Sequence, residues 1–267
     1  MRRSRWRSDP VVCVALKTAY SFTEQHSIKL MQAVILAGGL GTRMRPFTET
    51  VPKCLIPVNG RAFVDLQLDL LKTGGVRDIV LCLGYLGEMV QLHLGDGSDR
   101  GMHIEYAWDA PDCGGTAGAL KHAEPLLADN FFLTWGDSYV RVDYAAMMAA
   151  HRAGAPQVIA TMGVFRNQNA WDSSNVEIAE NKVVRYVKNA PELRLQYIDA
   201  GISVFQKSAL QEIPPGQNVA LEPYFATWAG KGSLGAYEIA DRFYEVGSWT
   251  GLADFEKFIG AASGDPV

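Results

Sequence analysis

A run of five apolar residues that ends in glycines constrains the fold of this chain more than any other feature. Residues 33–37 read Ala-Val-Ile-Leu-Ala, and Gly38 and Gly39 follow directly. A continuous apolar run of this length, bounded by glycines, predicts a strand that is buried on both faces. Strands of this kind occur in sheets that carry helices on both sides, so the run favours an α/β architecture.

From Met31 onward, predicted strands alternate with predicted helices. Segment 63–73 is a clear example, because its apolar residues form a broad helical face that ends at Gly74 and Gly75. Repeated β-α units of this length predict an α/β fold with a doubly wound, mostly parallel sheet and right-handed crossovers. The other expected strands of this part are 78–83, 103–107, 131–135 and 158–164, and the other expected helices are 86–94, 116–127 and 143–153.

The pattern changes after residue 165. Residues 166–174 are polar, and the segment Glu180-Asn181-Lys182 predicts the turn of a hairpin. We expect an α+β elaboration of the same sheet rather than an independent domain. Its predicted strands are 176–178, 183–187, 201–205 and 234–239, and its predicted helices are 221–229 and 252–259.

Residues 1–30 differ in composition from the rest of the chain. They carry six Lys and Arg residues against two acidic ones, whereas the whole chain has a formal net charge of −4. Their apolar stretch is short and is interrupted by Lys17, which argues against a signal peptide. We expect residues 1–30 to be an extension outside the fold and the functional domain to span residues 31–262.

The composition excludes several functional classes. A hydrophobic fraction of 48% is typical of a packed globular protein and excludes disorder. The negative net charge argues against a nucleic-acid partner, and no apolar run approaches the roughly 18 residues that a membrane helix needs. The four cysteines lack the spacing of a zinc site, so we expect reduced thiols and a cytoplasmic location.

The loop after the first predicted strand carries the candidate chemistry. Gly38, Gly39 and Gly41 permit a tight turn whose backbone N–H groups can surround phosphate oxygens. Arg43 can add charge-assisted hydrogen bonds, and Lys53 can add a mobile positive charge. The loop has neither the Gly-Lys-Ser/Thr end of a Walker A motif nor the G-x-G-x-x-G pattern of a dinucleotide site. It predicts a phosphate-binding loop of another kind, with an ordinary glycine-rich turn as the alternative.

This loop resembles the signature of sugar-1-phosphate nucleotidyltransferases, L-A-G-G-x-G-T-R-x-x-P-x-T followed by P-K. Residues 36–48 match the signature, and Pro52 and Lys53 match its P-K. Residues 114–120 resemble the base-recognition segment of that family, G-T-A-G-A-L, and residues 133–137 resemble its strand that ends in G-D. The resemblance covers residues 31 to about 260 and implies a Rossmann-like, glycosyltransferase-A-like fold.

The resemblance also implies roles for individual residues. Arg43, Lys53 and Asp137 would be catalytic, and Lys53 would contact the reacting phosphates. Asp137 would bind Mg²⁺, and Glu245 would be the second metal ligand, at a position where the family usually has aspartate. Residues in or beside the glycine-rich segments would bind the nucleotide, namely Leu36, Ala37, Gly38, Gly39, Gly41, Thr42, Gly84 and Gly115. Residues from the second half would bind the sugar phosphate, namely Lys188, Asp199, Gly201 and Glu222.

The chemistry of these residue types suits one reaction. A sugar-1-phosphate oxygen attacks the α-phosphorus of a nucleoside triphosphate, and pyrophosphate leaves. Both substrates are polyanions, so the protein must mainly position them and neutralise their charge, with Mg²⁺ as cofactor. The compact size resembles that of heptose-1-phosphate guanylyltransferases and N-acetylmuramate-1-phosphate uridylyltransferases, and residues 174–177 and 197–199 favour the heptose- or mannose-1-phosphate guanylyltransferases. The base and the sugar are not identified by the sequence, and a homo-oligomer is left open.

Two other functions remain open from the sequence alone. A molybdopterin nucleotidyltransferase shares a glycine-rich start with an arginine, but Pro52-Lys53 and the Gly-Thr-Ala-Gly segment argue against it. A non-catalytic regulatory protein that binds a nucleotide sugar would not need to keep Asp137. Glu245 could also be a surface carboxylate, and Lys188 could be a solvated charge beside a hairpin.

Overall fold

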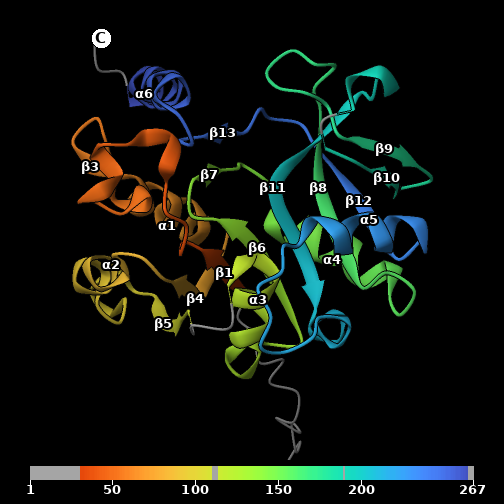
Figure 1. The fold of residues 1–267 in the computed structure, drawn as a ribbon, viewed down its shortest axis with the longest axis horizontal. Coiled ribbons are helices and arrows are strands. Elements are labelled where there is room, and N and C mark those ends of the chain that lie inside the picture. Colours follow the sequence, from red (N-terminus) through yellow and green to blue (C-terminus); the bar gives the residue numbers. More distant parts are fainter. Residues whose placement is uncertain (1–30, 110–113, 189, 264–267) are drawn as a thin grey trace, which may run out of the picture.

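The computed structural model describes residues 31–109, 114–188 and 190–263. Nine strands form one twisted sheet in the order β5-β4-β1-β6-β11-β8-β12-β10-β9 (Figure 1). Two additional two-stranded ladders, β2–β3 and β7–β13, lie outside it. Among the described residues, no helix combines the length and apolarity that a bilayer crossing requires.

One half of the sheet is parallel. It comprises β1 (Met31–Leu36), β4 (Val76–Leu83), β5 (His103–Trp108) and β6 (Asn130–Trp135), with β1 paired to both β4 and β6. Its connections carry α1 (Phe63–Thr73), α2 (Gly87–Leu94) and α3 (Gly115–His122). The expected strand at 33–37 therefore lies inside the sheet, as its continuous apolar sequence predicted.

The other half mixes strand directions. Strand β11 (Tyr197–Gln206) runs antiparallel to both β6 and β8 (Ala160–Arg166), and β12 (Leu234–Ile239) returns parallel to β8. The hairpin of β9 (Val176–Ala179) and β10 (Lys182–Tyr186) completes this edge. Its turn residues, Glu180 and Asn181, both have positive φ, as a tight two-residue hairpin requires.

Helices cover both faces of the sheet, which confirms the doubly wound α/β fold. In β1, Val34 belongs to the apolar cluster that includes residues of α3 and α5 (Glu222–Gly230), while Ala33 and Ile35 belong to a second cluster that includes residues of α1, α2 and α4 (Tyr144–Gly154). The alternation follows from the two-residue side-chain period of a strand. Asp143 caps α4 by accepting a 2.9 Å hydrogen bond from the backbone N–H of Ala146.

A smaller apolar cluster joins the two short ladders to the last helix, α6 (Trp249–Ser263). The ladders consist of β2 (Pro57–Val58) with β3 (Arg61–Ala62), and β7 (Ser138–Tyr139) with β13 (Tyr244–Glu245). Phe255 of α6 packs against Phe63, Tyr139 and Tyr244. Figure 1 shows α6 beside β3 and β13, over the parallel half of the sheet.

Several predicted boundaries were wrong. The helix expected at 116–127 ends at His122 and is followed by a short 3₁₀ helix, Glu124–Leu126, because Pro125 cannot continue an α-helix. The strand expected at 158–164 begins at Ala160, and the strand expected at 201–205 extends over residues 197–206. The last helix is also longer than the predicted 252–259: it starts at Trp249, where the Ser248 hydroxyl accepts a 3.1 Å hydrogen bond from the N–H of Gly251, and it continues to Ser263.

Candidate active site

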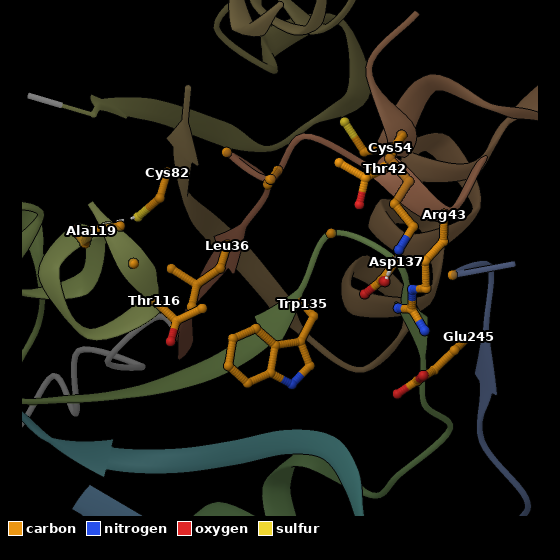
Figure 2. Close-up of a pocket in the computed structure, with 18 of the residues that line it drawn as sticks. Leu36, Thr42, Arg43, Cys54, Cys82, Thr116, Ala119, Trp135, Asp137 and Glu245 are labelled. Carbon is orange, nitrogen blue, oxygen red and sulfur yellow. Dashed lines mark hydrogen bonds and ion pairs between the residues drawn. The ribbon is translucent and has the colours of Figure 1, made fainter. Parts of the chain in front are cut away.

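A cavity of about 550 Å³ opens where β1 and β6 end (Figure 2). The glycine-rich loop forms one wall, and Asp137 and Glu245 lie at the far end. A second cavity of about 280 Å³ continues from it and shares Arg43, Trp135, Lys188 and Glu245 with the first. The first cavity contacts most of the residues expected to bind nucleotide, namely Leu36, Ala37, Gly38, Gly39, Gly41, Thr42 and Gly115.

The glycine-rich loop is fixed by hydrogen bonds to its own backbone. Gly41 has a φ of +59°, and a Cβ there would lie 2.9 Å from Cγ2 of Thr48. The hydroxyl of Thr48 and the N–H of Met44 donate hydrogen bonds of 2.8 and 2.9 Å to the carbonyl of Gly41. The conformation therefore requires glycine at this position, and the loop presents backbone rather than side chains to the cavity.

Asp109, which the sequence interpretation did not single out, lies against Gly38, expected at the triphosphate, and Gly84, expected against the base. A Cβ on Gly38 would approach the Asp109 carboxylate to 2.6 Å, and a Cβ on Gly84 would also clash with it. Gly84 is therefore separated from the cavity by Asp109, which lines it. Partial burial raises the pKa of Asp109. Asp109 directly follows β5, and an acidic residue at the end of a predicted strand is the sequence signal that could have identified it, as it did Asp137.

Gly115 begins α3 with a φ of +73°, and a Cβ there would clash with the backbone carbonyl of Val219. The N–H of Ala117 donates a 2.9 Å hydrogen bond to the same carbonyl. Thr116 lines the cavity, and its hydroxyl oxygen accepts a 2.8 Å hydrogen bond from the N–H of Leu221. Packing against the segment before α5 thus explains why glycine is needed at residue 115.

The two expected metal ligands are brought together by the β7–β13 ladder. Glu245 pairs with Ser138, the residue after Asp137, and the N–H of Val246 donates a 2.9 Å hydrogen bond to the carbonyl of Asp137. Lys53 forms an ion pair with the Asp137 carboxylate. Figure 2 shows the side chains of Asp137, Arg43 and Glu245 at the same end of the cavity.

The electrostatics of this end favour a divalent cation. Glu245 opens onto the cavity, but the surrounding protein limits its hydration, and this desolvation together with the charges of Asp137 and Asp199 raises its pKa to about 7. Adjacent carboxylates of this kind are stabilised when a cation binds between them, and oxygen donors suit Mg²⁺. Asp137 and Glu245 therefore fit Mg²⁺ as ligands.

Gly247 provides room for the positive charges. A Cβ at this position would lie 3.0 Å from Nη2 of Arg43 and 3.3 Å from Nζ of Lys53. Gly247 was not predicted as a site residue, although it follows Glu245 in the Tyr-Glu-Val-Gly segment. The glycine allows both cationic side chains to reach the cavity from the same side.

Three of the residues expected on the sugar side, Lys188, Asp199 and Gly201, line the second cavity, whereas Glu222 lines the first. Lys188 forms a 2.7 Å ion pair with Glu222, and both line the first cavity beside it. Asp199 accepts a 2.9 Å hydrogen bond from the N–H of Gly201, and burial raises its pKa to about 6. Gly201 has a φ of +78° where the β11–β8 register shifts. Three further lining residues were missed by the sequence interpretation, namely Asp172, Ser173 and Asn175.

A separate group of metal-ligating side chains lies away from both cavities. Ligand atoms of Asp78, His103 and Glu105, on β4 and β5, are all within 4.8 Å of one another. Asp78 is already engaged, because it accepts a 3.0 Å hydrogen bond from Gln32 and lies 3.1 Å from a ring nitrogen of His103. This group does not include any residue that was expected to bind metal.

Residues 32–259 match the profile of a family described as Nucleotidyl transferase. The chain therefore belongs to the nucleotidyl transferase family. This result confirms the resemblance carried by the glycine-rich loop and the G-T-A-G-A-L segment.

Individual relatives differ in the substrates that their names state. The chain is 27% identical over 230 residues to a mannose-1-phosphate guanylyltransferase of Mycobacterium tuberculosis, covering 86% of this chain but 63% of that protein. It is 27% identical to an N-acetylmuramate alpha-1-phosphate uridylyltransferase of Neisseria meningitidis, covering 86% of this chain and 99% of that protein. The structure of HddC from Yersinia pseudotuberculosis, complexed with GMP-PN, has a TM-score of 0.70 at 20% identity and covers 86% and 99% of the two chains. The fold is thus that of nucleotidyltransferases.

Proposed function

We propose that this protein transfers a nucleoside monophosphate from a nucleoside triphosphate to a sugar-1-phosphate and releases pyrophosphate. The observation that carries the proposal is the Asp137–Glu245 pair, because both carboxylates line the first cavity and Glu245 also lines the second. One cavity offers a glycine-rich backbone suited to phosphates, and the other offers charged side chains suited to a sugar phosphate. Glu245 lines both cavities, so the two substrates would meet beside this pair.

The chain's own residues would act mainly by positioning and by neutralising charge. The glycine-rich loop would hold the triphosphate, and Arg43 and Lys53 would stabilise negative charge that builds up around the α-phosphorus. Asp137 and Glu245 would hold Mg²⁺, which supplies further charge neutralisation at the phosphates when bound. Lys53 already pairs with Asp137, so binding of substrate and metal would redistribute that ion pair.

The sugar phosphate would bind through side chains rather than backbone. Lys188 would contact the phosphate, and Asp199 and Glu222 would accept hydrogen bonds from sugar hydroxyls. Tyr186 hydrogen bonds to Asp199 and is itself buried, which would hold that carboxylate in place. The attacking phosphate oxygen is already anionic, so no general base is required for the reaction.

The position of Asp109 supports guanine as the base. A carboxylate can only accept hydrogen bonds, and the Watson–Crick edge of guanine presents two adjacent donors, N1–H and the N2 amino group. The other bases place an acceptor beside their donor on this edge. Guanine agrees with the stated activity of the mycobacterial relative, and we propose a heptose- or mannose-1-phosphate guanylyltransferase on this basis.

The test is pyrophosphate release with Mg²⁺, using four nucleoside triphosphates against a panel of sugar-1-phosphates. We expect release with GTP and one sugar phosphate. Asp109→Asn should lower kcat/KM for GTP by about 10- to 100-fold, the discrimination of one bidentate base contact. The exposed Asp99→Asn variant serves as the control. Preference for UTP would contradict the guanine assignment. No pyrophosphate release with any substrate pair, together with measurable binding of a nucleotide sugar, would favour a regulatory protein.

A further inference from the structure

Gln67 is buried in α1, with 2% of its surface exposed, and does not line either cavity. Its amide Nε2 donates two hydrogen bonds, each of 2.8 Å, to the backbone carbonyls of Trp135 and Ser138. These carbonyls stand on either side of Gly136 and Asp137. One side chain from α1 therefore holds both ends of the turn that carries the Asp137 carboxylate.

Other elements fix the middle of this turn. The N–H of Gly136 donates a 2.9 Å hydrogen bond to the carbonyl of Leu36 in β1, and the carbonyl of Asp137 accepts one from Val246. A Cβ on Gly136 would lie 2.9 Å from Cβ of Ala37, so the turn also packs tightly against the glycine-rich loop. The contacts from β1 and from the segment after β13 hold the centre, and Gln67 holds the flanks.

A buried glutamine at position 67 lowers the stability of the fold if it serves only to fill space. Its Oε1 is buried and has no hydrogen-bond partner among the described residues. Leaving a buried acceptor unpaired costs about 1–3 kcal/mol, a cost that an apolar side chain of similar size avoids. The two hydrogen bonds from Nε2 must therefore account for the presence of an amide here.

We propose that Gln67 is a positioning residue that fixes the 135–138 turn so that Asp137 faces Lys53 and Glu245. This inference rests on the proposed function only in treating Asp137 as a metal ligand. Without the two hydrogen bonds, the turn gains freedom and the Asp137 carboxylate samples positions away from Glu245. Metal binding and turnover then weaken, while the fold, which rests on the large apolar clusters, remains.

Gln32 provides a matched control. It is 3% exposed, and its Nε2 donates hydrogen bonds of 3.1 Å to the Leu126 carbonyl and 3.0 Å to Asp78, while its Oε1 accepts one of 2.7 Å from the N–H of Ala128. Gln32 lies near the start of β1, whereas the cavity opens at the end of that strand. Replacing Gln32 therefore also removes a buried amide that makes similar hydrogen bonds, but at a position remote from Asp137.

The experiment compares Gln67→Met with Gln32→Met in the full-length chain, using three measurements. Hydrogen exchange of the 135–139 backbone amides is measured without any ligand, and Mn²⁺ binding is measured by electron paramagnetic resonance with an unreactive α,β-methylene GTP. Pyrophosphate release is the third. Outer-shell groups of metal sites typically contribute 10- to 100-fold, so Gln67→Met should lower Mn²⁺ affinity and kcat by about 10- to 100-fold. Exchange at 135–139 should also accelerate, with none of these changes in Gln32→Met.

Each outcome is informative. Exchange, Mn²⁺ affinity and kcat within about twofold of the parent in folded Gln67→Met would overturn the proposal, as would equal changes in Gln32→Met. If Gln67→Met does not fold, Gln67→Asn keeps the amide but shortens its reach, and a normal Mn²⁺ affinity and kcat there would count against the positioning role. If the parent neither binds Mn²⁺ nor releases pyrophosphate, the proposed function fails. Unchanged exchange at 135–139 in Gln67→Met would instead show that Gln67 does not fix the turn.

Discussion

The two ends of the candidate site are built in different ways. On the nucleotide side, one contiguous loop after β1 contributes Ala37, three glycines, Thr42 and Arg43 to the cavity wall. On the sugar side, Lys188 follows β10, Asp199 lies on β11 and Glu222 begins α5. Every nucleotide substrate of such a family carries a triphosphate, so a fixed backbone can bind it. The sugar differs between members, and separate side chains can change with it.

The largest effect should come from the carboxylate at the junction of the two sides. Asp137→Asn should lower kcat about a thousandfold, because metal-assisted charge neutralisation contributes several kcal/mol and each 1.36 kcal/mol is tenfold in rate. Steady-state pyrophosphate release checks this, with thermal unfolding to confirm an intact fold. Asp69→Asn, an exposed aspartate that pairs with Arg61, is the control. Near-normal turnover by a folded Asp137→Asn variant would rule out the metal role.

A change in the glycine-rich loop should affect the nucleotide alone. Gly41→Val places a β-branched residue at a φ of +59° and a Cβ 2.9 Å from Thr48, so the loop must move. Such backbone strain costs about 1–3 kcal/mol, and we expect the KM for the triphosphate to rise about 10- to 100-fold. Gly60→Val is the matched control, because Gly60 also has a positive φ but has nothing within 4 Å of its Cβ position. An equal rise in the sugar-phosphate KM would erase the division between the two sides.

The complementary change is Lys188→Met on the sugar side. Loss of a hydrogen bond to a charged group costs about 1.5–3 kcal/mol, so the KM for sugar-1-phosphate should rise about tenfold or more while the triphosphate KM stays constant. Lys231→Met is closely matched, since Lys188 and Lys231 are 53% and 54% exposed and pair with Glu222 and Glu212 at 2.7 and 2.9 Å. If the KM for sugar-1-phosphate rises in both variants, or in neither, Lys188 forms only a surface ion pair.

The smallest expected effect concerns the pH dependence of stability and comes from a residue that lines neither cavity. His151 in α4 is fully buried, and burial lowers its pKa from 6.5 to about 4. The unfolded chain takes up a proton below pH 6.5 while the folded chain does not, so stability is lost as the pH falls from 6.5 towards 4. We expect a loss of about 2 kcal/mol between pH 7 and pH 5 from this group. Denaturant unfolding at pH 7 and pH 5 should show a smaller loss of unfolding free energy in His151→Phe than in the parent. Equal losses in the two proteins would exclude the histidine as the cause.

The nucleotide side could be predicted from the sequence because its signals are local. The apolar run, the glycines and Lys53 lie within a short stretch of chain, and a single loop brings them together. Asp137 was predictable for a similar reason, since a polar residue directly after a buried strand must lie at the sheet edge. Strand and helix types were recovered well, because their periodicities are also local properties.

The remaining features depend on contacts between distant segments. Nothing near residue 197 indicates that β11 runs antiparallel to β6, and this pairing defines the sugar side. Asp109 gains its place from two glycines in other loops, and Gln67 reaches the 135–138 turn from inside a regular helix. The amphipathic pattern of α1 marks Gln67 as one more residue of the helix, so its hydrogen bonds could not be foreseen.

The β7–β13 ladder has a consequence for the synthesis of the protein. The ribosome makes the glycine-rich loop and Asp137 by about the middle of the chain, whereas Glu245 and Gly247 emerge close to the end of the described residues. A nascent chain that has folded its parallel strands could already bind a triphosphate, yet it would lack the partner carboxylate and the sugar side. If the proposed function holds, Mg²⁺ binding and turnover would become possible only after nearly the whole domain has left the ribosome, and incomplete chains would be inert.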